Sequence, residues 1–255
     1  MADASAALVV QFGAWAPHAE LGWLCTRALR EEPKLRAAGY RIRPRPLHWP
    51  DERTDFVILE TRAPAAAAEA LLRHRPADRA QVRAVSPMRH YSAGPPARRP
   101  LAGPPSRGGA SVPKDYITTH LNASHWWARG ARGSGVRVAI FDTGLPAINS
   151  AKIAEAVNFA SERTTDDRVG HSAFMTGVIG GSRGACAGLA PDTTVYIARV
   201  FDSNQQSTTE WFLAAFNFAL SRDVDLINLS VGGPDFRDAP FVEKALLNYF
   251  ISVTE

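Results

Sequence analysis

Val138-Ala139-Ile140-Phe141-Asp142-Thr143-Gly144 is the stretch that decides the fold, because its apolar run ends abruptly in an aspartate. The run predicts a buried strand over 136–141. Twenty-nine positions later (171 − 142), Gly170-His171 opens a stretch of small and apolar residues that predicts a helix over 171–179. Side chains that follow the strands of a parallel sheet gather at its carboxyl edge. We therefore expect Asp142 and His171 to meet there.

Strands and helices alternate along the rest of this half of the chain. Further strands are predicted over 194–200 and 225–230, and further helices over 120–128, 209–220 and 240–249. This alternation indicates an α/β domain with a parallel sheet covered by helices on both faces.

The first ninety residues follow a different pattern. The predicted order is β-α-β-β-α-β, the split βαβ arrangement, in which two helices cover one face of an antiparallel sheet. Its strands are predicted over 7–12, 40–45, 55–60 and 81–85, and its helices over 20–31 and 65–72. Residues 93–113 then hold six prolines and four glycines, which predicts an exposed linker. The expected domains are 1–92 and 114–255, with 93–113 between them.

Composition excludes several classes of protein. The 255 residues are 45% hydrophobic, which permits a sizeable core, and Cys25 and Cys186 form no metal or disulfide pattern. No apolar run reaches the length of a membrane span, and the first residues lack the basic start of a secretion signal. Residues 1–110 carry a net charge of +7 and residues 111–255 carry −3, which suggests mutual attraction. Nucleic-acid binding is the rival interpretation, but the arginines are scattered and no recognised motif accompanies them.

The Asp142 and His171 pair is more specific than either residue alone. An aspartate after a strand is often a helix cap, and a histidine after glycine often belongs to the core. Together, a buried carboxylate orients an imidazole and stabilises its cation while the other ring nitrogen removes a proton from a hydroxyl. The pair therefore indicates two of the three groups of a charge-relay hydrolase.

Spaced motifs give this half a family resemblance. Asp142-Thr143-Gly144, Gly170-His171 and 228–234 (Asn-Leu-Ser-Val-Gly-Gly-Pro) resemble the subtilisin-like serine proteases in the order Asp, His, Ser. A narrower resemblance, to a membrane-anchored proprotein convertase of that family, extends to the N-terminal half, which is similar to its propeptide. The resemblance implies a subtilisin-like α/β fold preceded by a ferredoxin-like α+β propeptide domain.

The resemblance also implies roles for individual residues. Asp142 is expected to be the orienting acid and His171 the general base. Ser230, Val231 and Gly232 are expected to form an edge that pairs with an extended peptide or protein substrate. The propeptide is expected to fold against its own catalytic half and to be cleaved at Arg89-His90-Tyr91-Ser92. Arg98-Arg99 is a poorer cleavage site because proline follows it.

Two departures from the family pattern qualify these expectations. Ser172 stands where the family has glycine, and its side chain is predicted to displace the imidazole. The Gly-Thr-Ser nucleophile motif does not occur in the sequence. We therefore expect a fragment of a serine endopeptidase precursor that is inactive alone. The alternative is a pseudoprotease or an inhibitory binding module. A nucleotide-binding domain is a weaker alternative, because no glycine-rich phosphate loop follows the strand.

The sequence and the resemblance lead to different expectations for metal binding and for compartment. No metal ligands are predicted, although the resemblance implies that Ca²⁺ can bind. It also implies the secretory pathway, for which the chain itself offers no signal peptide.

Overall fold

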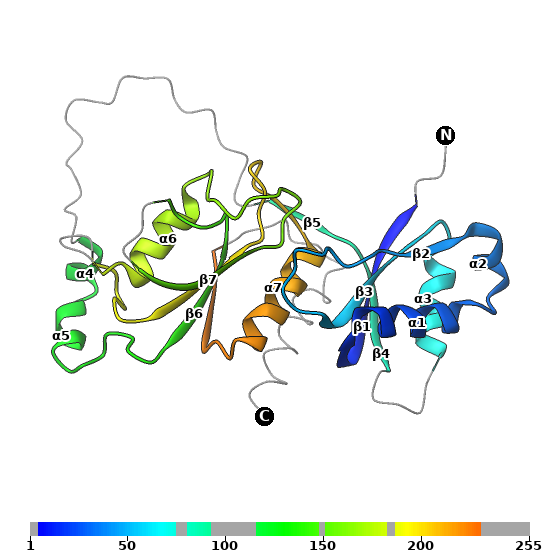
Figure 1. Ribbon diagram of the computed structural model, residues 1–255, viewed down its shortest axis with the longest axis horizontal. Coiled ribbons are helices and arrows are strands. Elements are labelled where there is room, and N and C mark those ends of the chain that lie inside the picture. Colours follow the sequence, from blue (N-terminus) through cyan, green and yellow to red (C-terminus); the bar gives the residue numbers. More distant parts are fainter. Residues whose placement is uncertain (1–4, 75–80, 93–115, 148–150, 183–186, 231–255) are drawn as a thin grey trace, which may run out of the picture. The chain divides into compact units, whose positions relative to one another are not determined.

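The computed structural model describes residues 5–74, 81–92, 116–147, 151–182 and 187–230 (Figure 1). The chain divides into two compact units. Among the described residues, the first contains 5–74, 81–90 and Thr208–Asn217, and the second contains 91–92, 116–147, 151–182, 187–207 and 218–230. The predicted linker 93–113 and the predicted helix 240–249 lie outside the described residues.

The first unit contains an antiparallel sheet of four strands in the order β2-β3-β1-β4. Its long central strands pair Val9 with Ile58 and Val10 with Val57. The four strands are β1 (Ala6–Pro17), β2 (Tyr40–Ile42), β3 (Arg53–Thr61) and β4 (Val82–Pro87). Each lies where the sequence predicts a strand.

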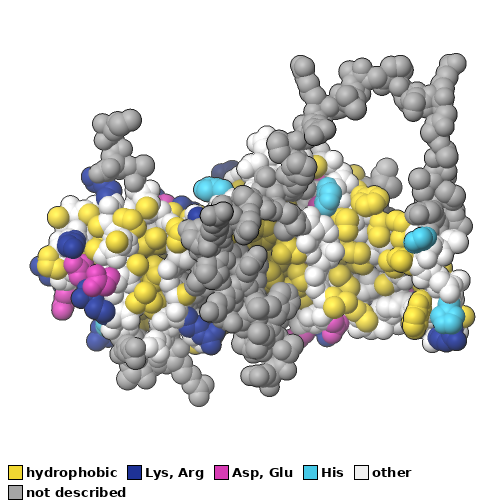
Figure 2. All heavy atoms as spheres, turned by 180° about the vertical axis from the view of Figure 1, so that it is seen from behind, with side chains coloured by type: hydrophobic (Ala, Val, Ile, Leu, Met, Phe, Trp, Pro, Cys, Tyr) yellow, Lys and Arg dark blue, Asp and Glu magenta, His cyan; other side chains and the backbone are white. Residues whose placement is uncertain are grey.

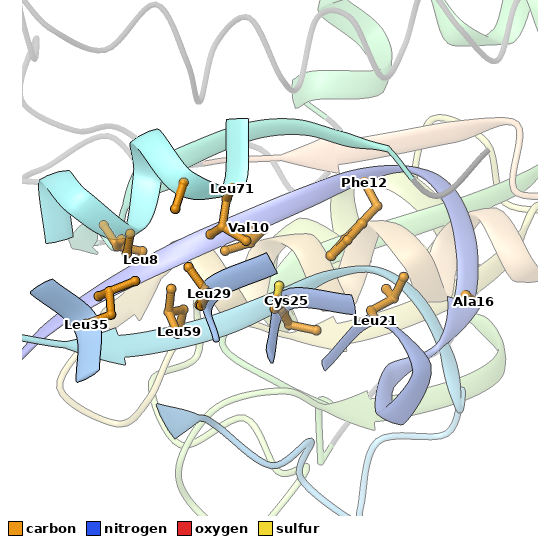
Figure 3. Packing of buried hydrophobic residues seen from close by; sticks show 13 residues of the cluster. Leu8, Val10, Phe12, Ala16, Leu21, Cys25, Leu29, Leu35, Leu59 and Leu71 are labelled. Carbon is orange, nitrogen blue, oxygen red and sulfur yellow. The ribbon is translucent and has the colours of Figure 1, made fainter. Parts of the chain in front are cut away.

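Helices pack on one face of this sheet. They are α1 (His18–Leu29), α2 (Pro33–Ala38) and α3 (Pro64–Arg73), and the sequence predicts α1 and α3 but not α2. Alternate residues of β1 point at these helices, which is the two-residue period of a strand covered on that side. Figure 3 shows the resulting core, in which Leu8, Val10 and Phe12 face Leu21, Cys25, Leu29 and Leu71. Burial raises the pKa of the Cys25 thiol to about 12, so Cys25 behaves as an inert core residue.

The first part of α7 (Thr209–Ser221) also belongs to the first unit. Glu210, in its first turn, forms an ion pair of 2.5 Å with Arg43, which also binds Glu60. Asn217 donates from Nδ2 to Thr54 Oγ1 at 2.9 Å and to Asp55 Oδ1 at 3.2 Å. Glu210, Asn217 and Asp55 are all buried, so these contacts satisfy polar groups that water does not reach.

The second unit contains a parallel sheet in the order β10-β6-β8-β7. Val138 and Ile140 of β6 pair in register with Val195 and Ile197 of β8, and the four side chains form one apolar cluster. The strands are β6 (Arg137–Asp142), β7 (Lys152–Asn158), β8 (Thr194–Arg199) and β10 (Leu226–Leu229). The sequence predicts all of them except β7. Helix α6 (His171–Gly180) packs against β6 and β8, as predicted for a helix following the Asp142 strand.

The predicted single helix over 120–128 is wrong. Two short helices, α4 (Tyr116–His120) and α5 (Ala123–Trp127), stand in its place. Asn122 separates them in the left-handed region at φ 52°, which no helix continues through.

Among the described residues, no helix combines the length and the apolar character that crossing a membrane requires. Figure 2 shows hydrophobic atoms between the charged side chains on the face it draws. The large exposed hydrophobic residues of the described part are Trp23, Leu47, Leu72, Ile117, Leu121, Trp126, Phe174 and Leu226.

Two neighbouring leucines of α3 test the core of the first unit. Leu71 is fully buried, whereas Leu72 is 49% exposed. Leu71→Ala is expected to lower the free energy of unfolding by about 2–5 kcal/mol, because it removes apolar burial and leaves a cavity. Leu72→Ala is expected to lower it by about 1 kcal/mol or less. Urea unfolding of both variants measures the difference, and equal effects would contradict this packing.

Candidate active site

The site begins where strand β6 ends. Asp142 is its last residue and is only 1% exposed, because β6 lies between β10 and β8 in the sheet. His171 is the first residue of α6, and its side chain is 42% exposed. The structure therefore places a buried acid beside a partly accessible imidazole.

The two side chains are in direct contact, as the sequence predicts. His171 Nδ1 lies 2.9 Å from Asp142 Oδ1 and 2.8 Å from Oδ2. An ionised carboxylate only accepts hydrogen bonds, so Nδ1 carries the proton. In the neutral imidazole, Nε2 is then left as an acceptor. This is the tautomer that a general base needs.

Burial raises the pKa of Asp142 above the ordinary value for aspartate. Two hydrogen-bond donors oppose this effect by stabilising the carboxylate, namely the His171 ring and the Thr143 amide at 2.7 Å. The Thr143 hydroxyl oxygen lies 3.1 Å from Asp142 Oδ1. The acid is therefore desolvated but not left unpaired, which is the condition for keeping a buried charge.

Gly144 lets the chain leave the strand closely packed against the next segment. Its φ is 134°, and a Cβ at this position would lie 2.5 Å from Thr165 O. Leu145 then pairs with that segment, donating from N to Thr165 O at 2.7 Å and accepting from Asp167 N at 2.8 Å. The Asp-Thr-Gly motif thus needs glycine at position 144, because a side chain there would collide with the backbone of Thr165.

The Thr143 hydroxyl joins the strand of the acid to the helix of the base. Its Oγ1 accepts a hydrogen bond of 3.1 Å from Ser172 N, in the first turn of α6. The first amides of a helix have no partner within the helix, so this contact caps α6 from the end of β6. Thr143 is the neighbour of Asp142 and Ser172 is the neighbour of His171, so this hydrogen bond limits the movement of the acid relative to the base.

Arg199, the last residue of β8, is 1% exposed and pairs in register with Asp142. Its Nε donates to Thr143 O at 3.1 Å and its Nη1 to Thr164 O at 2.6 Å, while Nη2 contacts Glu162. Glu162 also accepts from the amide and hydroxyl of Ser203. The buried guanidinium therefore fixes the backbone at Thr143, directly after the acid, and at Thr164, beside the segment that pairs with Leu145.

Ser172 does not displace the imidazole, so that prediction is wrong. Its side chain is fully buried in α6, and His171 Nδ1 keeps its contact with Asp142. Of the predicted substrate edge, Ser230 follows β10 and accepts from Asn228 Nδ2 at 2.9 Å. Val231 and Gly232 lie outside the described residues.

The predicted cleavage segment lies mostly in strand β5 (His90–Ser92), which pairs with β9 (Gln206–Thr208). Arg89, just before β5, exchanges two hydrogen bonds with Thr209. Its amide donates to Thr209 Oγ1 at 3.1 Å, and its carbonyl accepts from Thr209 N at 3.0 Å. The segment is therefore extended, and its backbone pairs with β9 and with Thr209, the residue that follows β9.

The described residues contain no group of three or more His, Cys, Asp or Glu side chains arranged to hold a metal ion.

Two further site residues, Asp167 and Arg199, were not singled out from the sequence, and Thr143 was quoted only as part of the Asp-Thr-Gly motif, without a role. Asp167 has a local signal, because an aspartate shortly before a helix is typical of a cap. An arginine that ends an apolar strand gives no comparable signal. Its role depends on carbonyl groups more than thirty residues away in the chain.

Comparison with known proteins agrees with this geometry. Residues 133–254 match the model of the subtilase family. The chain is 48% identical over 138 residues to the human membrane-bound transcription factor site-1 protease, and 47% identical over 133 residues to the subtilisin-like protease SBT6.1 of Arabidopsis thaliana. These alignments cover 52% and 51% of this chain but only 13% of each relative. The major intracellular serine protease of Bacillus subtilis is 31% identical over 139 residues, which are 50% of this chain and 43% of that protein.

Two arginines of the second unit test the buried guanidinium. Arg199→Met is expected to lower the free energy of unfolding by about 3–5 kcal/mol, because it leaves buried acceptors without a donor. Arg132 pairs with Asp192 at the surface, where the two side chains are 39% and 43% exposed. Arg132→Met is therefore expected to lower it by about 1 kcal/mol or less. Denaturant unfolding measures both, and similar losses would contradict the role of Arg199.

Proposed function

We propose that this protein is the precursor of a subtilisin-like serine endopeptidase of the proprotein-convertase type, because residues 133–254 match the subtilase family model. The observation that carries the proposal is the contact between His171 Nδ1 and both carboxylate oxygens of Asp142. The chain spans 13% of the length of its eukaryotic relatives, so the activity of a whole enzyme is part of the proposal.

In this mechanism, Asp142 is the orienting acid and His171 the general base. The carboxylate holds the Nδ1 proton, and Nε2 takes the proton of an attacking hydroxyl. The imidazolium that forms is stabilised by a carboxylate that has little access to water. The same imidazolium then protonates the leaving amine of the cleaved peptide.

The nucleophile is the part that this sequence does not supply. It contains no Gly-Thr-Ser motif. The 255-residue chain is therefore proposed to be a fragment that does not hydrolyse peptides by itself. Without the serine of that motif, His171 has no nucleophilic hydroxyl from which to remove a proton.

Ser230, Val231 and Gly232 are proposed to bind the backbone of a peptide or protein substrate. The register pairs Leu229 with Phe141, which sets Ser230 level with Asp142 at the carboxyl ends of adjacent strands. Substrates of open α/β sheets bind at that edge. Pairing with an extended peptide supplies main-chain hydrogen bonds.

Residues 1–92 are proposed to be a ferredoxin-like propeptide, with 93–113 as linker and 114–255 as the first half of the catalytic domain. The strand order β2-β3-β1-β4 supports this, because it is the order of a split βαβ fold. The contacts of Arg43 with Glu210 and of Asp55 with Asn217 support packing of the propeptide on helix α7.

The alternative is a pseudoprotease or inhibitory binding module. Its main support from the sequence is Ser172, a change that loss of catalytic constraint would permit. The undisturbed Asp142–His171 contact removes the physical argument that Ser172 abolishes catalysis. The precursor is therefore the better-supported function.

Labelling with a serine-directed fluorophosphonate tests the catalytic pair. No label is expected on the 255-residue chain, whereas the product of a reading frame extended past Glu255 is expected to react. In that product, His171→Ala is expected to lower the labelling rate by about 10³-fold or more, because the general base is lost. His125→Ala, at an exposed histidine of α5, is the matched control. A stop codon after Glu255, with stable expression of an unlabelled chain, would favour the binding module instead.

Sequencing of the processed N-terminus tests the propeptide. An active extended product is expected to cut itself at Arg89-His90-Tyr91-Ser92, because this segment is already extended and bound along β9. Arg89→Ala is expected to slow processing about tenfold or more, by removal of a recognised side chain. Arg98→Ala is the control and is expected to process normally. A single cut far from residues 89–101 would overturn this assignment.

A further inference from the structure

Asp167 lies in the loop before α6 and accepts four hydrogen bonds. Its Oδ1 accepts from the Thr143 hydroxyl at 2.8 Å, from Gly170 N at 2.8 Å and from Val169 N at 3.0 Å. Its Oδ2 accepts from Ala173 N at 2.8 Å. One carboxylate therefore contacts both the residue after Asp142 and the backbone around His171.

These contacts replace a cap that α6 cannot make for itself. The residue before the helix is Gly170, at φ 93°, and it has no side chain to accept from the first amides. Two of those amides have partners from outside the helix: Ser172 N donates to Thr143 Oγ1, and Ala173 N donates to Asp167. The orientation of the first turn, which carries His171, is therefore set by these two side chains.

The Thr143 hydroxyl has one proton and two nearby carboxylates. Its Oγ1 lies 2.8 Å from Asp167 Oδ1 and 3.1 Å from Asp142 Oδ1. The shorter contact is the better hydrogen bond, so the proton points to Asp167. The lone pairs of Asp142 are then available to Thr143 N and to the Nδ1 proton of His171.

We propose that Asp167 is a positioning residue that acts through Thr143 and the first turn of α6 to hold the His171 imidazole against Asp142. Its consequence for catalysis rests on the proposed function. The geometry that it sets exists in the 255-residue chain and is measurable without activity.

Ionisation of Asp167 agrees with this role. Burial acts to raise its pKa, but the amides of Gly170, Ala173 and Val169 and the Thr143 hydroxyl together outweigh burial, and the pKa is lowered. The carboxylate therefore strengthens the folded state above the ordinary pKa of aspartate. That contribution is lost as the pH falls through the lowered value.

Proton NMR of the 255-residue chain with ¹⁵N-labelled histidine tests the proposal. A low-field Nδ1 proton is expected, and its disappearance in His171→Ala assigns it. Asp167→Ala is expected to abolish this signal, because the imidazole is released from Asp142. Asp167→Asn is expected to weaken it, since an amide oxygen replaces Oδ1 while the NH₂ group cannot accept from Ala173 N. Asp166→Ala is the matched control, because the Asp166 carboxylate accepts a hydrogen bond from the nearby Thr164 hydroxyl rather than from Thr143 or the first turn of α6 in the described part of the chain, and it is expected to leave the signal unchanged.

A purely structural cap gives a different result. Amide exchange of Ala173 would then accelerate about tenfold or more in Asp167→Ala while the His171 signal stayed as in the unchanged chain. That outcome would overturn the proposal. Where Asp167→Ala fails to fold, Asp167→Asn and Thr143→Val decide: a full His171 signal in both folded variants also overturns it. Loss of the signal without fluorophosphonate labelling of the extended product would support positioning by Asp167 while contradicting the proposed function.

Discussion

The buried carboxylate of Asp142 is the constraint on which the site depends. A charge that is 1% exposed costs several kcal/mol in desolvation unless hydrogen bonds compensate for it. Thr143 N and His171 Nδ1 provide that compensation, and both require a defined backbone. The Asp-Thr-Gly turn, the cap of α6 and the packing of Gly144 against 165–166 therefore all hold the backbone that places these hydrogen-bond donors beside the buried carboxylate.

Arg199 shows how the sheet separates its buried charges. It lies in register with Asp142, and a direct ion pair would lower the pKa of Asp142 and occupy its oxygens. The guanidinium instead donates to Thr143 O and Thr164 O and pairs with Glu162. The positive charge thus stiffens the loops beside the acid and leaves the carboxylate to the imidazole. Arginine suits this task because its planar fork reaches several acceptors at once.

Elements with strong apolar periodicity could be predicted from the sequence, and so could the meeting of Asp142 with His171. Strands β6 and β8 and helix α7 are apolar over most of their length, and β3 contains the apolar run 56–59, so the apolar pattern alone identifies these elements. Strand β7 was missed because it lies at a sheet edge and is mostly half-buried, with Lys and Glu among its residues. The break at Asn122 depends on a single left-handed residue, which periodicity does not reveal. The roles of Asp167 and Arg199 come from contacts between distant segments, for which local sequence carries little information.

Ser172 replaces the glycine of the family pattern without disturbing the contact between His171 and Asp142. It was expected to crowd the imidazole, yet its side chain points into the buried side of α6, as does that of Thr176 one turn later. Neither hydroxyl has a hydrogen-bond partner among the described residues. A buried hydroxyl without a partner costs about 1–3 kcal/mol. The serine therefore acts on the stability of α6 packing, while the orientation of His171 is set from the other side, by Thr143 and by the carboxylate of Asp142.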